Sequence, residues 1–197
     1  MNNKGFILRS KSKPQRSEGF SAKRKTAGFT VIELLVVVLV IAILAITAWV
    51  VLNPPEIVKK IHDGDRLTDM ADLRQAITTV SMEATQSASQ VLCHNTSVPC
   101  KGSSNNDGRS ANGSGWLKVS IETQKSVSMP TLPIDPLNDG NYHYAYCANG
   151  NDWELATKLE SSSQANKMRG DGGNDNNLYE VGTNLNLISP TSGVCTF

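Results

Sequence analysis

Residues 25–52 read KTAGFTVIELLVVVLVIAILAITAWVVL, and this stretch decides the fold of the chain. From Phe29 onward its only hydrophilic members are Thr30, Glu33 and Thr47. As an α-helix, residues 29–52 would be about 36 Å long, enough to cross a hydrocarbon core of roughly 30 Å. The sequence therefore predicts one membrane-spanning helix.

Charge is distributed unevenly along the chain. The 197 residues carry a net charge of +1, but residues 1–28 carry +7 and the remainder carries −6. The positive-inside rule places the basic cluster Lys23-Arg24-Lys25 in the cytoplasm and the body after Leu52 outside it. An acidic body repels phosphate, so we expect no nucleic-acid partner for it.

Two simple interpretations of such an N-terminus leave Glu33 unexplained. A cleaved secretory signal has an apolar stretch of about 7–15 residues and a small-residue cleavage site. This stretch is longer and ends at Asn53-Pro54-Pro55. An uncleaved signal anchor fits the length. A carboxylate inside an apolar helix is costly without a partner, so Glu33 is a candidate functional residue.

The motif KTAGFTVIE at residues 25–33, followed by the apolar helix, resembles the cleavage and methylation motif of type IV pilins and type II secretion pseudopilins. The resemblance implies that a prepilin peptidase cuts between Gly28 and Phe29 and that an N-methyltransferase modifies the new Phe29 amine. It also implies that Glu33 pairs with the amine of another subunit during assembly. Two further Gly-Phe bonds, at residues 5–6 and 19–20, lack both the acid and the apolar helix.

Beyond the membrane segment the sequence predicts a second helical stretch. Asn53-Pro54-Pro55 predicts a break or bend. Apolar residues then recur three or four positions apart to about residue 92, with charged residues such as Asp63 and Arg66 on the intervening faces, as in an amphipathic helix. The apolar positions are Ile57, Ile61, Leu67, Met70, Leu73, Ile77, Val80, Ala84 and Val91.

The remaining sequence predicts a small antiparallel sheet. Residues 116–121 alternate and indicate a first strand. Residues 142–147 and 153–159 indicate a hairpin, with Asn149-Gly150 as its turn signal, and residues 178–181 indicate a last strand. The polar stretch 101–115 favours an exposed flexible loop. The proline-rich residues 127–136 favour an irregular connection.

The predicted fold class is therefore α+β. In the terms of the resemblance it is a pilin fold, a long N-terminal helix with a membrane-spanning first half, packed on a small antiparallel sheet. The expected organisation is a basic leader that is removed, a membrane and filament-core helix, an amphipathic second half of the long helix and a globular head. These parts span residues 1–28, 29–52, 53–92 and 93–197.

The four cysteines are expected to form disulfides, because the body lies outside the cytoplasm. Three pairings are possible. Proximity in sequence favours Cys93–Cys100, and Cys147–Cys195 would then tie the C-terminal tail to a strand. A metal site at Cys93 and its neighbour His94 is disfavoured by the oxidising surroundings and the wide spacing.

Residues 132–160 are similar, more weakly, to the Pro-x-Asp-Pro segment and Tyr-x-Tyr strand of major pseudopilins. Several members of that family bind calcium near the C-terminus, and here Asp171 and Asp175 offer oxygen ligands on a glycine-rich loop. A solvated polar turn is the alternative for this loop. No cofactor is required by the sequence.

The chain is expected to be a structural subunit and not an enzyme, since it contains no P-loop, H-E-x-x-H or G-x-S-x-G motif. The expected partners are other copies of the chain, the prepilin peptidase and methyltransferase, an inner-membrane assembly platform and membrane lipid. A precursor in the inner membrane would give an extracellular or periplasmic filament. A type II secretion pseudopilin and a membrane-anchored binding domain that never polymerises remain as alternatives.

Overall fold

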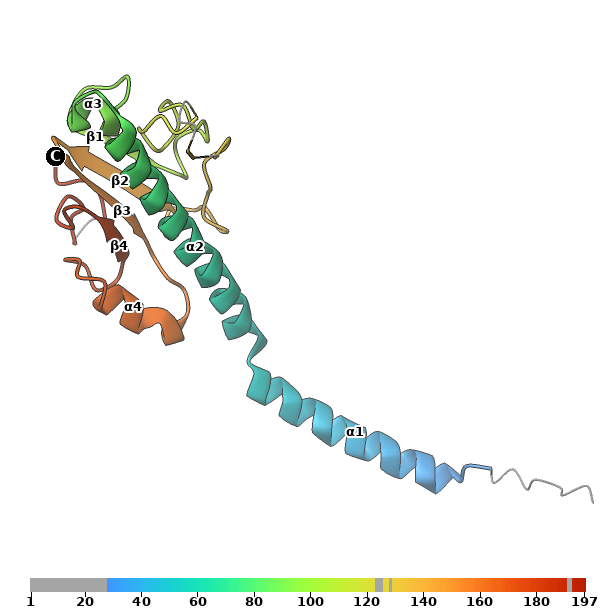
Figure 1. The fold of residues 1–197 in the computed structure, drawn as a ribbon. Coiled ribbons are helices and arrows are strands. Elements are labelled where there is room, and N and C mark those ends of the chain that lie inside the picture. The colour runs from blue at the N-terminus through green and yellow to red at the C-terminus, as the bar shows by residue number, and fades with distance from the viewer. Residues whose placement is uncertain (1–27, 123–125, 128, 191–192) are drawn as a thin grey trace, which may run out of the picture. The chain divides into compact units, whose positions relative to one another are not determined.

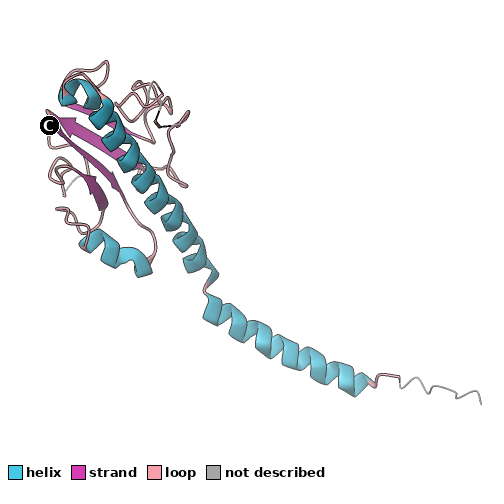
Figure 2. Cartoon of the chain, in the orientation of Figure 1, coloured by secondary structure: helices cyan, strands magenta, loops and turns pink. Residues whose placement is uncertain are grey.

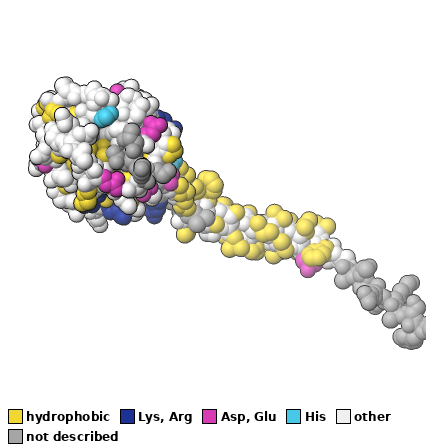
Figure 3. Space-filling model, turned by 45° about the horizontal axis from the view of Figure 1, so that its top comes forward, with side chains coloured by type: hydrophobic (Ala, Val, Ile, Leu, Met, Phe, Trp, Pro, Cys, Tyr) yellow, Lys and Arg dark blue, Asp and Glu magenta, His cyan; other side chains and the backbone are white. Residues whose placement is uncertain are grey.

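The apolar stretch forms helix α1 (Val31–Leu52), whose side chains are exposed from Val31 to Trp49. The computed structural model describes residues 28–197 apart from 123–125, 128 and 191–192. Among these residues, Val31–Trp49 is the one stretch long and apolar enough to cross a membrane. Apolar side chains cover the visible face of α1 (Figure 3). So large an exposed apolar surface requires lipid or other apolar helices around it.

A break at Asn53 separates α1 from helix α2 (Pro54–Glu83). The backbone of Asn53 is left-handed, with φ 41° and ψ 68°, a conformation that asparagine tolerates better than most residues. Pro54 and Pro55 occupy the first turn of α2, where a missing N–H costs no hydrogen bond. The predicted break is therefore present. The chain forms two units, one up to Thr47 and one from Ala48.

The second helix is shorter than expected. It ends at Glu83, and a separate short helix, α3 (Ala88–Leu92), follows after extended backbone at Ala84. The expectation of one helix to residue 92 is therefore wrong in its last part. The intervening residues include Thr85 and Ser87, and such side chains weaken helices by competing for backbone hydrogen bonds.

Helix α2 packs on a sheet through the second half of its apolar stripe. Met70, Leu73 and Ile77 are fully buried. The first half of the predicted stripe is wrong, since Ile57 and Ile61 are exposed. The buried positions of that part of α2 are charged, namely Asp63 and Arg66.

The sheet has four antiparallel strands in the order β1-β2-β3-β4 (Figures 1 and 2). Strands β2 and β3 form the predicted hairpin, closed by the pair Asn149 and Asp152. Strand β4 confirms the predicted last strand. The bounds are β1 (Cys100–Ser103), β2 (Tyr144–Asn149), β3 (Asp152–Thr157) and β4 (Tyr179–Gly182); helices η1 (Ser162–Gln164) and α4 (Ala165–Arg169) lie between β3 and β4.

The first strand is not where the sequence analysis puts it. Strand β1 lies in the stretch expected to be a flexible loop, and Gly102 within it packs so closely on the backbone of Trp116 that a Cβ would lie 1.9 Å from the Trp116 oxygen. Residues 116–121 form no strand, and Trp116, Leu117 and Val119 are all fully buried. Their backbone bonds to other loop residues: the N–H of Trp116 donates to the carbonyl of Gly108.

The two faces of the sheet have different partners. The inner face, which carries Tyr144, Tyr146 and Leu155, joins the core with α2. The outer face, which carries Cys147 and Ala156, is covered by Leu187 and Ile188 of the C-terminal segment, the part of the chain that follows β4. The predicted α+β class, with a long N-terminal apolar helix and a small antiparallel sheet, is confirmed.

Candidate functional site

The predicted cleavage bond lies in an exposed segment just before α1. Gly28 and Phe29 belong to no helix or strand, and Phe29 is 77% exposed. A Cβ built on Gly28 meets no atom within 4 Å among the described residues. The backbone at this bond is therefore uncrowded among the described residues. Residues 1–27, the rest of the expected leader, lie outside the described residues.

Thr30 and Glu33 together form the start of α1. The backbone N–H of Glu33 donates to Thr30 Oγ1 at 3.3 Å, which is the contact of a helix N-cap with the third helical residue. A carboxylate in the first turn also complements the helix dipole. The sequence pattern Thr-x-x-Glu before an apolar run carries this signal, and the sequence analysis missed it. Glu33 thus has a local structural role in addition to the predicted pairing role.

A buried charged cluster ties α2 to two distant segments of the head. Arg66 donates to both carboxylate oxygens of Asp135, from Nε at 2.6 Å and from Nη2 at 2.8 Å. Its Nη1 donates to Glu160 at 2.6 Å and to Asp63 at 3.0 Å. His62 lies 2.9 Å from the same Glu160 oxygen. The Arg66, Asp63 and Asp135 side chains are fully buried.

The carboxylates of this cluster also hold backbone. Asp63 accepts the N–H groups of Glu160 and Ser161, both at 2.8 Å. Asp135 accepts the N–H groups of Leu137 and Asn138. Burial alone lowers the pKa of Arg66, but the hydrogen bonds to Asp135 and Glu160 outweigh it and raise that pKa. The guanidinium is therefore permanently charged and fully paired, so the cluster is structural.

Two tyrosines near the cluster contact side chains of α2. The ring of Tyr142 lies 5.0 Å from the guanidinium carbon of Arg66, within cation–π range. Tyr144 donates its hydroxyl to Asp69 at 2.6 Å. Burial and this bond raise the pKa of Tyr144, and burial raises that of Asp69. The Asp-Pro segment and the Tyr-x-Tyr strand are thus both fastened to α2.

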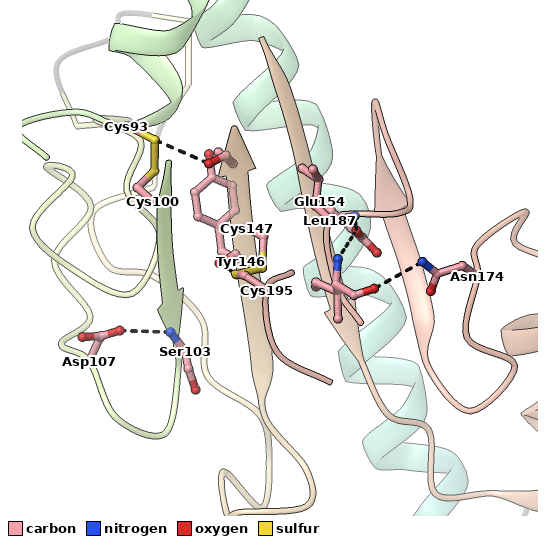
Figure 4. The surroundings of a disulfide bond; sticks show 12 residues. Cys93, Cys100, Ser103, Asp107, Tyr146, Cys147, Glu154, Asn174, Leu187 and Cys195 are labelled. Atoms are coloured by element: carbon pink, nitrogen blue, oxygen red, sulfur yellow. Dashed lines mark hydrogen bonds between the residues drawn. A yellow bond between two sulfur atoms is a disulfide. The ribbon is translucent and has the colours of Figure 1, made fainter. Parts of the chain in front are cut away.

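All four cysteines are paired as the sequence analysis expects. Cys93–Cys100 joins the end of α3 to β1, and Cys147–Cys195 joins β2 to the C-terminal segment (Figure 4). Tyr146 lies beside Cys147 on β2 and donates its hydroxyl to the carbonyl of Leu92 at 2.8 Å. The C-terminal tail is therefore covalently fixed to the outer face of the sheet.

The loop expected to bind calcium is shaped by its own aspartates. Asp171 accepts the N–H of Gly173 with one oxygen and that of Glu180 with the other. Asp175 accepts the N–H and the side-chain amide of Asn177. Among the described residues no three acidic, histidine or cysteine side chains converge as metal ligands. Ca²⁺ takes six to eight oxygens, so these two side chains do not fit a calcium site by themselves, and calcium stays a prediction.

Comparison with known proteins finds one match. Residues 23–49 match the family model of the prokaryotic N-terminal methylation motif. No curated protein and no solved structure matches the chain. The matched range contains Gly28, Phe29, Thr30 and Glu33, so this N-terminal segment carries the methylation motif of type IV pilin-like precursors.

Proposed function

We propose that the chain is the precursor of a structural subunit of a type IV pilus-like filament. Prepilin peptidase would cut between Gly28 and Phe29, the Phe29 amine would be methylated, and the subunits would polymerise through α1. The observation that carries this proposal is the methylation motif at residues 23–49, placed at the start of an apolar helix.

The exposed surface of α1 supports polymerisation. Large apolar side chains such as Leu34, Leu39 and Ile46 are at least half exposed in the single chain. Each gains about 1.5–3 kcal/mol when it moves from water to an apolar environment. Membrane lipid provides that environment for the precursor, and neighbouring α1 helices provide it in a filament.

The electrostatics of the helix start support the role of Glu33. It is the one acidic residue of α1. Cleavage after Gly28 creates an amine at Phe29, and a carboxylate in an apolar bundle needs such a cation. A pairing between Glu33 of one subunit and the amine of another would fix the register of the filament.

A secretion pseudopilus is the second candidate function. The Asp-Pro segment favours it, because Asp135 forms the central ion pair of the head and the same segment resembles that of major pseudopilins. A surface pilus is favoured by the tail that Cys195 fixes to the sheet. The two candidates share processing at Gly28. They differ in the location of the filament, which is the cell surface for a pilus and the periplasm for a pseudopilus.

Intact mass and N-terminal sequencing of sheared and membrane fractions test these functions. A sheared species that begins at N-methylated Phe29 supports a surface pilus. A processed species confined to membrane and periplasm supports the pseudopilus. A chain that still begins at Met1 in every fraction contradicts both and supports a simple membrane anchor.

A further inference from the structure

Two glutamates face one another under the C-terminal segment, on the outer face of the sheet. Glu154 lies on β3 and Glu180 on β4, and their strands pair so that Ala156 stands opposite Glu180 and Gly182 opposite Glu154. Both residues are buried, at 0% and 1% exposure. Figure 4 shows Glu154 directed toward the backbone of Leu187. Neither glutamate was singled out by the sequence analysis.

One oxygen of each carboxyl group holds a covering segment in place. Glu154 Oε2 accepts the backbone N–H groups of Leu187 and Ile188, both at 2.8 Å. Glu180 Oε2 accepts the N–H of Asp175 at 3.0 Å. Gly173 lies so close that a Cβ there would be 2.0 Å from this oxygen. The pair therefore anchors the C-terminal segment and the loop of residues 170–177.

The other two oxygens lack a donor. Glu154 Oε1 and Glu180 Oε1 are buried, and neither has a hydrogen-bond donor in the described part of the chain. The two side chains lie on the same face of neighbouring paired strands, two positions out of register, and each carboxyl group shifts the pKa of the other. Two ionised carboxylates so placed and so deeply buried would repel one another. A proton on one of them removes a charge and supplies the missing donor.

We propose that Glu154 and Glu180 share one proton and form a pH-sensitive latch, which holds the C-terminal segment and the 170–177 loop on the outer face of the sheet. With the proton present, the pair carries one negative charge and both segments are held. When the proton leaves, two adjacent buried carboxylates repel, and the segments that cover them open to admit water. The latch does not depend on filament assembly.

One neighbouring charge, that of Asp171, favours the protonated pair. Asp171 lies close enough for its charge to raise the pKa of both carboxyl groups. The pKa of Glu180 is raised to about 8, first by burial and then by the bond to Glu154. Asp175 contributes its N–H from the same loop.

Helices α2 and α4 add two cations beside Glu180, and Tyr179 of β4 adds a titratable hydroxyl. Arg74 of α2 and Lys167 of α4 line, with Asp171 and Glu180, a cavity of about 330 Å³. The C-terminal segment presents Leu187, Ile188 and the disulfide-bonded Cys195, none of which titrates.

Amide hydrogen exchange on the full chain in detergent micelles tests the latch between about pH 6 and about pH 9. After correction for the intrinsic exchange rate of each amide, peptides that contain Leu187 and Asp175 should lose protection as the pH rises. The loss should be up to about tenfold per pH unit and should level off above about pH 8. Glu180→Gln supplies a permanent donor to Glu154 and should make the protection independent of pH. The matched control is Glu122→Gln, an exposed residue, which should behave as the wild type.

Two outcomes of this experiment overturn the latch. One is wild-type protection that does not change with pH. The other is Glu180→Gln protection that changes as in the wild type.

Infrared spectroscopy of the wild type provides a test that does not rely on a variant. At about pH 6 the carbonyl stretch of a protonated carboxyl should be present, and it should disappear above about pH 8. Its absence at about pH 6 contradicts the proposal. If excess calcium instead removes the pH dependence of exchange while that band is absent, the pair binds a metal ion and the shared proton is wrong.

Discussion

Arg66 of α2 and Asp135 of the head form a two-point ion pair, although they lie 69 positions apart in the sequence. Both side chains are fully buried, so neither charge can be solvated if its partner is removed. The pair joins the first half of α2 to the Asp-Pro segment. The apolar residues Ile57 and Ile61 of that half are exposed and do not make this connection.

Loss of either half of this pair should destabilise the head strongly. Asp135→Ala leaves a buried guanidinium with reduced pairing, which we expect to cost about 3–5 kcal/mol. Arg66→Lys keeps the charge but cannot make the two-point contact, so it should also destabilise. Urea unfolding in detergent, followed by tryptophan fluorescence, measures both. Asp65→Ala, on the exposed side of the same helix, should stay within about 0.5 kcal/mol of the wild type; an equal loss there would contradict this role.

The sequence predicts the parts of the fold that depend on local signals. The α1 helix follows from an uninterrupted apolar run, and the β2–β3 hairpin from alternation around Asn149-Gly150. The disulfide pairing follows from sequence proximity. Each of these signals lies within a short window of residues.

What the sequence analysis missed depends on tertiary placement. Asp63 and Arg66 continue the spacing of Met70 and Leu73, yet their charge predicts exposure to solvent. Only partners brought from residues 135 and 160 make their burial possible. Strand β1 was missed for a similar reason, because the polar residues around Gly102 are ordered by packing against Trp116.

Two buried tyrosines should make the head sensitive to alkali. Tyr144 bonds Asp69 and Tyr146 bonds the Leu92 carbonyl, and burial raises the pKa of both above the ordinary 10.0. A raised pKa in the fold contributes stability that is present below about pH 10 and is lost as the pH rises further. The unfolding constant should rise by about tenfold per pH unit for each such tyrosine. Tyr146→Phe should remove the contribution of one tyrosine to this pH dependence, which is about tenfold per pH unit. Urea titrations above about pH 10 measure it, and an unchanged pH dependence would contradict the assignment.

The two disulfides should contribute unequally to stability. Cys147–Cys195 spans 48 residues and Cys93–Cys100 spans 7. Loop-closure entropy then predicts losses of about 4 and about 2.5 kcal/mol when each pair is replaced by serines. Urea unfolding of the two double variants compares them directly. A larger loss for the Cys93 and Cys100 variant would mean that local packing, and not chain entropy, dominates.

A bulky residue at position 28 should block processing without disturbing the fold. The space around Gly28 is open among the described residues, so Gly28→Ile should fold normally but crowd the bond to Phe29. Intact mass should then show a chain that keeps its +7 leader. Gly19→Ile, at a Gly-Phe bond outside the motif, is the matched control and should be processed. Cleavage of the Gly28 variant at the same bond would show that the peptidase does not require a small residue at position 28.

Replacement of Glu33 should separate processing from assembly. Glu33→Ala should still be cut after Gly28 and methylated, because the scissile bond is untouched, but it should be absent from sheared filaments, since the new amine of Phe29 has lost its carboxylate partner. Mass spectrometry of membrane and sheared fractions measures both steps. Thr30→Ala is the matched control: it removes the cap on the Glu33 N–H and weakens the helix start by about 1 kcal/mol, but it keeps the charge, and so it should assemble. Normal filaments from Glu33→Ala would disprove the pairing role. Equal failure of Thr30→Ala would show that the start of the helix, and not its charge, is what assembly requires.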